Sequence, residues 1–220
     1  TDWYINHLRY KINQSDPIDV LMSPKQIEGN TRDVVFFNAN PQFPENRYYD
    51  LYQMMKDYVG TDVSLVSAQN GNQYYTFPVH KVAIPVDKQL VLSNGTVNAT
   101  DSVVDAVRFT IPKNNIYKND LAILNIIAAN KWKRPIYFTM PYDELGFANY
   151  VRRDGLSYRL EPIENSSVNT DWTYNVMMTK FGFGNANIPN VYFDEENRRH
   201  LNTIRKAEVD LAFDLINKNR

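Results

Sequence analysis

The 220-residue sequence predicts an α/β fold, a mixed sheet with flanking helices followed by a C-terminal helix. Three stretches carry this prediction. The run Asp33–Asn38 is apolar and rich in β-branched residues, as in a buried strand. Asn119–Met140 predicts a helix that leads through a short basic loop into an apolar strand. Glu195–Asn219 has apolar residues at three- and four-residue spacing, which indicates a long amphipathic helix capped by Asp194.

The other predicted elements are shorter, and turn-forming residues separate them. In chain order they are a helix over Trp3–Lys11, a strand over Ile18–Met22, a helix over Tyr48–Val59, strands over Tyr74–Pro78, Lys81–Pro85, Gln89–Leu92, Val103–Ile111 and Leu156–Leu160, and a helix or strand over Trp172–Lys180. Gly60 follows the second of these helices directly, as in a glycine cap. Phe181–Pro189 predicts a flexible segment of aromatic and glycine residues.

The helix within Asn119–Met140 has the clearest signals. Asn119 and Asp120 suit its start, because their side-chain oxygens accept the free N–H groups of a first turn. Asn130 suits a left-handed cap at its end, and the basic residues of the following KWKRP segment would lie at the negative end of the helix dipole. We therefore interpret the basic loop as a partner of the helix end, not as a phosphate-binding turn.

Composition excludes several classes of site. The sequence has no cysteine, which excludes disulfides, thiol nucleophiles and cysteine-ligated metals. Its 24 basic and 25 acidic residues give a net charge of -1, which offers no electrostatic basis for binding nucleic acid. No apolar run approaches the roughly 20 residues that span a membrane. The sequence starts at threonine without a signal-peptide pattern, and we expect it to be part of a longer protein.

Motifs for nucleotide binding or nucleophilic catalysis are missing from the sequence, including the P-loop, G-x-G-x-x-G and G-x-S-x-G. The three histidines, His7, His80 and His200, lie in different predicted elements, and we expect them to be surface or structural groups. We expect no metal and no other cofactor. Paired carboxylates perform glycosidase chemistry when they lie about 5–10 Å apart, a separation that the sequence does not show.

Two clusters combine aromatic and charged side chains: Asp2, Trp3 and Tyr4, and Trp132, Lys133 and Arg134. Aromatic faces beside carboxylates suit sugar rings, and guanidinium groups suit phosphates. These six residues are the candidate substrate-binding residues. The alternative interpretation is structural, with Trp3 as a core anchor and the basic residues as partners of a helix end.

Several segments carry a resemblance: TDWYINHLRYK (residues 1–11), DPI (16–18), TRDVVFF (31–37), KNDLAILNIIAANKWKRPIYF (118–138) and GLSYRLEPI (155–163). They resemble a bacterial family of multi-pass membrane proteins that has a domain of unknown function and is related to the protein O-mannosyltransferases, the lipid-sugar-dependent glycosyltransferases. The resemblance implies a soluble domain on the periplasmic, extracytoplasmic face of the inner membrane. The family's first strand would be missing here, and residues 191–220 would begin a helical-repeat region after an α/β domain of residues 1–190.

The resemblance also implies a function. In the related glycosyltransferases the catalytic carboxylate lies in the membrane half, so no residue of this chain inherits that role. We expect a non-catalytic accessory domain that positions a lipid-linked sugar or a protein acceptor at the membrane face, with its own membrane-helix bundle as partner. The six candidate residues would line that face. Two alternatives stay open, namely a stand-alone, hydrolase-like α/β domain that acts on glycans and a protein-interaction scaffold.

Overall fold

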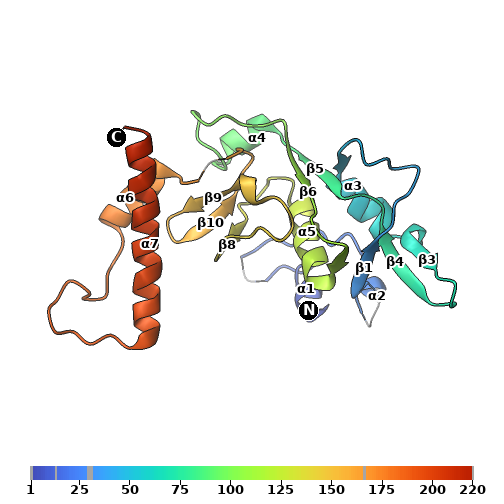
Figure 1. Ribbon diagram of the computed structural model, residues 1–220, viewed down its shortest axis with the longest axis horizontal. Helices are drawn as coiled ribbons and strands as arrows, with labels where there is room; N and C mark the ends of the chain where they lie inside the picture. Colours follow the sequence, from blue (N-terminus) through green and yellow to red (C-terminus); the bar gives the residue numbers. More distant parts are fainter. Residues whose placement is uncertain (1, 13, 29–31, 166, 220) are drawn as a thin grey trace. The chain divides into compact units, whose positions relative to one another are not determined.

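The structure is a computed structural model that describes residues 2–12, 14–28, 32–165 and 167–219 (Figure 1). It confirms the predicted α/β fold with a C-terminal helix. By packing, the chain divides into a first unit, Thr1–Pro135 with Asp143–Ala148, and a second unit, Ile136–Tyr142 with Asn149–Arg220. The domain boundary at residue 190 stays a prediction.

The first unit contains helices that surround two small sheets. Its helical segments are α1 (Asp2–His7), α2 (Pro24–Ile27), α3 (Leu51–Gln53), η1 (Met54–Val59), η2 (Asp62–Ser64), α4 (Lys88–Ser93) and α5 (Lys118–Asn130). Its strands are β1 (Val34–Phe37), β2 (Tyr49–Asp50), β3 (Leu65–Ser67), β4 (Gln73–Phe77), β5 (Lys81–Pro85), β6 (Ala106–Thr110) and β7 (Asn115–Tyr117). The strand orders are β3-β4-β1-β7 and β2-β5-β6, where the prediction was one mixed sheet.

Each sheet contains one parallel pair, β1 with β4 and β2 with β5, and its other pairs are antiparallel. Parallel strands need a long crossover connection, and the helical segment α3–η1 lies within both crossovers. Its apolar face is fully buried at Leu51, Met55 and Val59. The predicted helix over Tyr48–Val59 therefore begins late, because Tyr49 and Asp50 pair with β5 before the helix starts.

Two predicted strands are wrong for different reasons. Gln89–Leu92 lies in helix α4, because the Asp87 carboxylate accepts hydrogen bonds from the N–H groups of Gln89 and Leu90 and caps that helix. Ile18–Met22 joins no sheet, and its backbone instead bonds to the side chain of Asn125 on α5. In both segments a polar side chain decided the structure, where apolar composition had predicted a strand.

The ends of α5 also differ from the prediction, although Leu121, Leu124 and Ile127 are buried as expected. The helix begins at Lys118 without a side-chain cap, since the Asp120 carboxylate is buried and lies 2.9 Å from Lys113 Nζ. At the other end Asn130 is still helical, and Lys131 is the left-handed residue with φ 47°.

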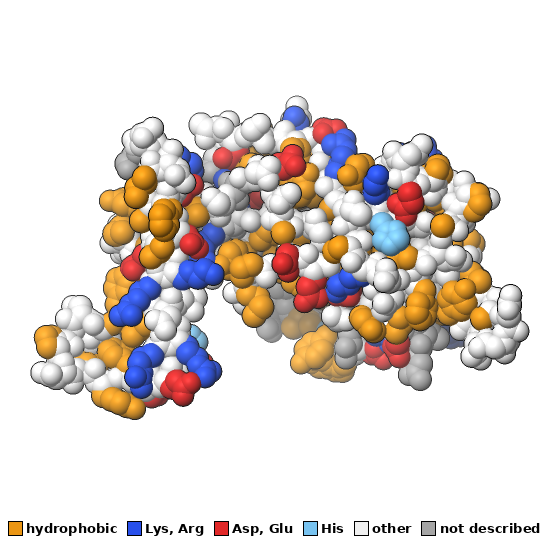
Figure 2. Space-filling model, viewed as in Figure 1, with side chains coloured by type: hydrophobic (Ala, Val, Ile, Leu, Met, Phe, Trp, Pro, Cys, Tyr) orange, Lys and Arg blue, Asp and Glu red, His pale blue; other side chains and the backbone are white. Residues whose placement is uncertain are grey.

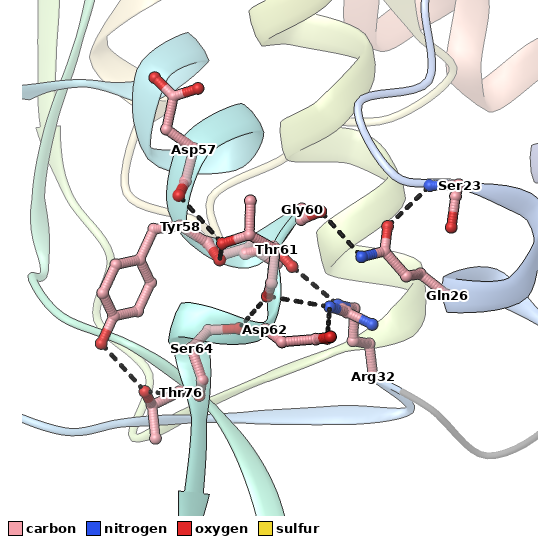
Figure 3. Close-up of polar contacts among 11 residues, drawn as sticks. Ser23, Gln26, Arg32, Asp57, Tyr58, Gly60, Thr61, Asp62, Ser64 and Thr76 are labelled. Atoms are coloured by element: carbon pink, nitrogen blue, oxygen red, sulfur yellow. Dashed lines mark hydrogen bonds and ion pairs between the residues drawn. The ribbon is translucent and has the colours of Figure 1, made fainter.

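Arg32 fixes the end of η1 from inside the first unit (Figure 3). Its side chain is 1% exposed, and its Nε donates to the carbonyl oxygen of Val59 at 2.7 Å. One Nη donates to the carbonyl oxygen of Thr61 at 3.1 Å, and the guanidinium carbon lies 3.9 Å from the centroid of the Tyr75 ring. Gln26 adds a bond to the Gly60 carbonyl at 2.8 Å. Together these bonds satisfy carbonyl groups that the end of a helix leaves free.

The second unit is an antiparallel sheet with two helices. It contains β8 (Tyr137–Phe138), β9 (Val151–Asp154) and β10 (Ser157–Leu160) in the order β8-β10-β9, then α6 (Thr170–Thr179) and α7 (Glu195–Asn217), and η3 (Ala148–Tyr150) precedes β9. The predicted Asp154-Gly155 turn joins β9 to β10, with Gly155 at φ +62°. Trp172–Lys180, predicted as helix or strand, is helical up to Thr179.

Helix α7 has one buried and one exposed apolar side. Ala207 and Leu211 pack with Met177 of α6, and Arg153 of β9 lies 3.0 Å from Asp210 of α7. Figure 2 shows further hydrophobic side chains on the surface over α7 and over the loop before it. By exposed fraction, Phe213 and Ile216 are the most exposed large apolar residues of α7. Flexibility of Phe181–Pro189 stays a prediction.

Substitution of Gly146 tests the close packing of the first unit. Its φ is +87°, and an added Cβ would lie 2.0 Å from the carbonyl oxygen of Thr110. Gly71 is a matched control, because its φ is +83° and its added Cβ meets no atom within 4 Å. We expect Gly146→Ala to lower the free energy of unfolding by about 2 kcal/mol more than Gly71→Ala in chemical denaturation. Equal losses in the two variants would contradict the close contact.

Candidate functional site

A pocket of about 410 Å³ in the first unit is the candidate site. Its walls include Asp50, Tyr52, Asp87, Lys131, Trp132 and Lys133, and we call it the Trp132 pocket. Ile84 and Leu90 add apolar surface. The pocket thus combines apolar and aromatic walls with a few charged groups, as small-molecule sites commonly do.

The sheet β2-β5-β6 places the two carboxylates of the pocket. Asp50 ends β2 and Asp87 follows the end of β5, and these two strands are parallel neighbours. Carboxyl ends of parallel strands meet at one edge of a sheet, where ligands of open α/β sheets commonly bind. Asp50 Oδ1 accepts from the N–H of Tyr52 at 2.8 Å, and Asp87 Oδ1 accepts from the N–H of Gln89 at 3.0 Å. Helix capping therefore holds both carboxylates in place as acceptors.

The backbone has an unusual conformation at Trp132, which lines the pocket. Lys131 and Trp132 are successive left-handed residues, with φ 47° and 62°. Such a conformation costs a non-glycine residue roughly 1–2 kcal/mol, and strain of this kind concentrates at functional sites. The indole Nε1 donates to the carbonyl oxygen of Pro85 at 2.8 Å, and the Trp132 carbonyl accepts from Asn94 Nδ2 at 2.7 Å. The indole bond holds the side chain, which is 6% exposed, against the end of β5, and the bond from Asn94 holds the Trp132 backbone.

Positive groups complete the pocket. The Lys131 ammonium lies 3.7 Å from the centroid of the Tyr52 ring, within the range of a cation–π contact. Lys133 also lines the pocket. Its charged and aromatic groups therefore offer hydrogen-bond acceptors, hydrogen-bond donors and ring edges in one place. A polyhydroxylated ligand such as a sugar can use all three, because its hydroxyls donate and accept while its C–H groups contact the aromatic ring edges.

The structure separates the six residues that the sequence singled out. Trp132 and Lys133 line the pocket, whereas Arg134 donates to the carbonyl oxygen of Asp16 at 2.8 Å and holds the N-terminal segment. Asp2 lies at the opposite end of α5, where its carboxylate is 3.0 Å from Lys118 Nζ. The 13 residues of α5 span about 20 Å, so the two predicted clusters do not form one site.

Trp3 and Tyr4 are 64% and 72% exposed, so Trp3 does not anchor a core. The Trp3 ring lies 3.8 Å from the ring of His7, on the surface of α1. A binding role for these residues stays a prediction.

Sequence reasoning missed Asp50, Tyr52, Asp87 and Lys131. Asp50 was read as an internal residue of a predicted helix, and Asp87 as a residue between two strands. An aspartate at or just after the end of a strand and directly before a helical segment is the pattern that identifies both as helix caps. That pattern predicts a carboxylate at the end of each strand, but it does not predict that the two carboxylates share a pocket.

His80 forms a separate pair with Glu45. Its Nδ1 lies 3.0 Å from Glu45 Oε1, which also accepts from the His80 backbone N–H at 2.8 Å. The imidazole stacks on Phe37 with 3.9 Å between ring centroids. Burial alone would raise the pKa of Glu45, but the hydrogen bonds from His80 outweigh it and lower the pKa. The pair joins the loop before β2 to the turn before β5, which agrees with the structural role expected for this histidine.

The second unit holds a buried cluster of charges. Tyr137, Arg159 and Arg152 stand opposite one another on β8, β10 and β9. Opposed arginines repel, and the Glu161 carboxylate lies beside both, 2.5 Å from Arg152 and 3.7 Å from Arg159. Asp154 lies 3.8 Å from Arg159 on the same side. Burial raises the pKa of Glu161 to about 7, although the ion pair with Arg152 opposes the shift.

The raised pKa of Glu161 predicts a pH-dependent stability. Between pH 4.5, its ordinary pKa, and about pH 7, the folded chain binds a proton that the unfolded chain releases, so stability falls as pH rises. We expect this contribution to fall by up to about 3 kcal/mol across that range. Glu161→Gln removes the titration. The free energy of unfolding of this variant, minus that of the unmodified chain, should therefore be larger at pH 8 than at pH 5. Denaturant titrations at both pH values measure this, and a constant difference would contradict the shift.

Comparison with known proteins gives one match. A family model described as TMEM260-associated domain 2 matches residues 1–180, which include the whole Trp132 pocket. No curated protein and no solved structure is significantly similar to the chain. In the part of the chain that the structure describes, no helix has both the length and the apolar character needed to cross a bilayer. The chain belongs to the family of TMEM260-associated domain 2, a domain linked to a family of membrane proteins.

Proposed function

We propose that the chain is a non-catalytic accessory domain of a membrane-embedded, O-mannosyltransferase-like glycosyltransferase. In this proposal the Trp132 pocket binds the sugar of a donor or acceptor at the extracytoplasmic face of the membrane. The composition of the pocket carries the proposal: two capped carboxylates, Trp132, Tyr52 and two lysines surround a space of about 410 Å³. Such groups bind hydroxyls and sugar faces.

The state of the carboxylates favours binding over catalysis. Hydrolysis of a glycosidic bond requires one carboxylic acid that donates a proton to the leaving group. Asp50 and Asp87 each accept hydrogen bonds from two backbone N–H groups, so both carboxylates already act as acceptors, which is the role that binding of sugar hydroxyls uses. The sequence resemblance agrees, because it places the catalytic carboxylate of the related transferases in their membrane half.

Membership of a family linked to membrane proteins supports a membrane setting. The partner that we propose is a membrane-helix bundle in the same protein, which would supply the reacting groups. The accessory domain would then hold the sugar-bearing ligand beside that bundle and raise its local concentration.

One observation favours a second candidate, a hydrolase-like domain that acts on glycans by itself. Asp50 and Asp87 lie in one pocket, as the two carboxylates of a glycosidase do. Incubation of the chain with oligosaccharides and lipid-linked sugars distinguishes the candidates. We expect binding without turnover, and turnover would overturn the accessory role.

Charge removal tests the pocket itself. Asp50→Asn and Asp87→Asn keep a good capping residue but remove a charged acceptor. We expect each to weaken binding of neutral mono- and oligosaccharides about tenfold, in line with the loss of one hydrogen bond to a charged group. Titrations followed by NMR or calorimetry measure the effect.

The matched control is Asp194→Asn, which makes the same substitution at the N-cap of α7 in the second unit. It should leave binding unchanged. Equal affinities for all three variants and the unmodified chain would contradict the assignment of the pocket.

A further inference from the structure

A second hollow adjoins the Trp132 pocket. It has a volume of about 560 Å³ and is lined by Pro17–Ser23, Arg9, Lys56 and Tyr52, and we call it the Arg9 groove. Tyr52 lines both spaces, so its ring forms the boundary between them. A ligand longer than one sugar ring that enters the Trp132 pocket beside Tyr52 would continue into the Arg9 groove.

Positive charge gathers at this boundary. The Lys131 ammonium, on the pocket side, lies 3.7 Å from the centroid of the Tyr52 ring, and the Lys56 ammonium, on the groove side, lies 6.0 Å from it. Both lysines are exposed, and within the described ranges neither forms an ion pair. Two ammonium groups near one ring repel each other, and an anion at the edge of that ring, close to both, reduces the repulsion.

The other charges of the groove have fixed partners or face solvent. Arg9 donates to the carbonyl oxygens of Val20 and Met22, so it adds positive charge while its guanidinium is already held. Asp19 is the acidic residue of the groove, and it is exposed. The carboxylates of the neighbouring pocket cap α3 and α4 through their Oδ1 atoms, and in the proposed function they accept hydroxyl groups of the neutral sugar. The lysine pair at Tyr52 is therefore the part of the surface best suited to an anionic group.

We propose that the two spaces together bind an acidic oligosaccharide. Its neutral ring occupies the Trp132 pocket, its anionic group lies at the edge of the Tyr52 ring near Lys56 and Lys131, and the next sugar lies in the Arg9 groove. The inference rests on the proposed sugar-binding function and adds the substrate class. The shared chemistry is an anion on a sugar, either a carboxylate or a phosphate.

Binding measurements on the full 220-residue chain test the proposal. The probes are a neutral disaccharide, a disaccharide of a neutral hexose with glucuronic acid, and a neutral disaccharide that carries a phosphate. At low salt we expect at least one acidic probe to bind about tenfold more tightly than the neutral one. This preference should shrink at high salt, because exposed charges are screened. The tighter acidic probe identifies the anion.

Lys56→Gln, on the groove side, should remove most of that preference and leave affinity for the neutral probe unchanged. Lys131→Gln should also remove most of it, and because Lys131 lines the Trp132 pocket, it should weaken binding of the neutral probe as well, but less than binding of the acidic one. Lys206→Gln is the control, since it removes an exposed lysine of α7 in the second unit. Equal affinities for neutral and acidic probes would contradict the proposal that the ligand is acidic, but they would leave the proposed sugar-binding function in place. An equal loss for all probes in the lysine variants would also contradict an acidic ligand. Failure of every probe to bind would overturn the proposed function as well.

Discussion

The buried amide of Asn125 joins the extended segment before α2 to α5. It lies in the middle of α5 and is 1% exposed. Its Oδ1 accepts from the Leu21 N–H at 2.9 Å, and its Nδ2 donates to the Asp19 carbonyl at 3.1 Å. An unpaired buried amide costs about 1–3 kcal/mol, so the helix and the extended segment fix each other's position. The Arg9 groove depends on this contact, because that segment is its wall.

Apolar pattern was enough to predict the elements that bury a continuous face. Asp33–Asn38 and the helix α5 were identified because a run of apolar residues or a helical repeat of them has few alternatives in a folded chain. Where a distant polar partner decides the outcome, prediction failed. Ile18–Met22 resembles a strand in composition, yet its partner is a side chain more than 100 residues away. Asp120 resembles a helix-capping residue, yet its carboxylate is buried and forms an ion pair with Lys113.

The candidate site was less predictable than the fold for the same reason. Trp132 and Lys133 were predicted as binding residues because they form a cluster in the sequence. The carboxylates in the same pocket come from two other segments of the chain. Asp50 and Asp87 become neighbours through the parallel pairing of β2 with β5, and single-sequence reasoning has no access to strand pairing. A local motif therefore identified one wall of the pocket, and tertiary structure supplied the opposite one.

The basic segment after α5 shows how a cluster in sequence separates in space. The sequence interpretation assigned all its cations to the helix end, where the dipole attracts them. In the structure Lys131 turns to the Tyr52 ring, while Arg134 bonds to the Asp16 carbonyl. The two left-handed residues at Lys131 and Trp132 explain this divergence, because they end the helical repeat that would set the directions of successive side chains. The strain of these residues is offset by the bonds of Trp132, so the same local geometry ends the helix and builds the pocket.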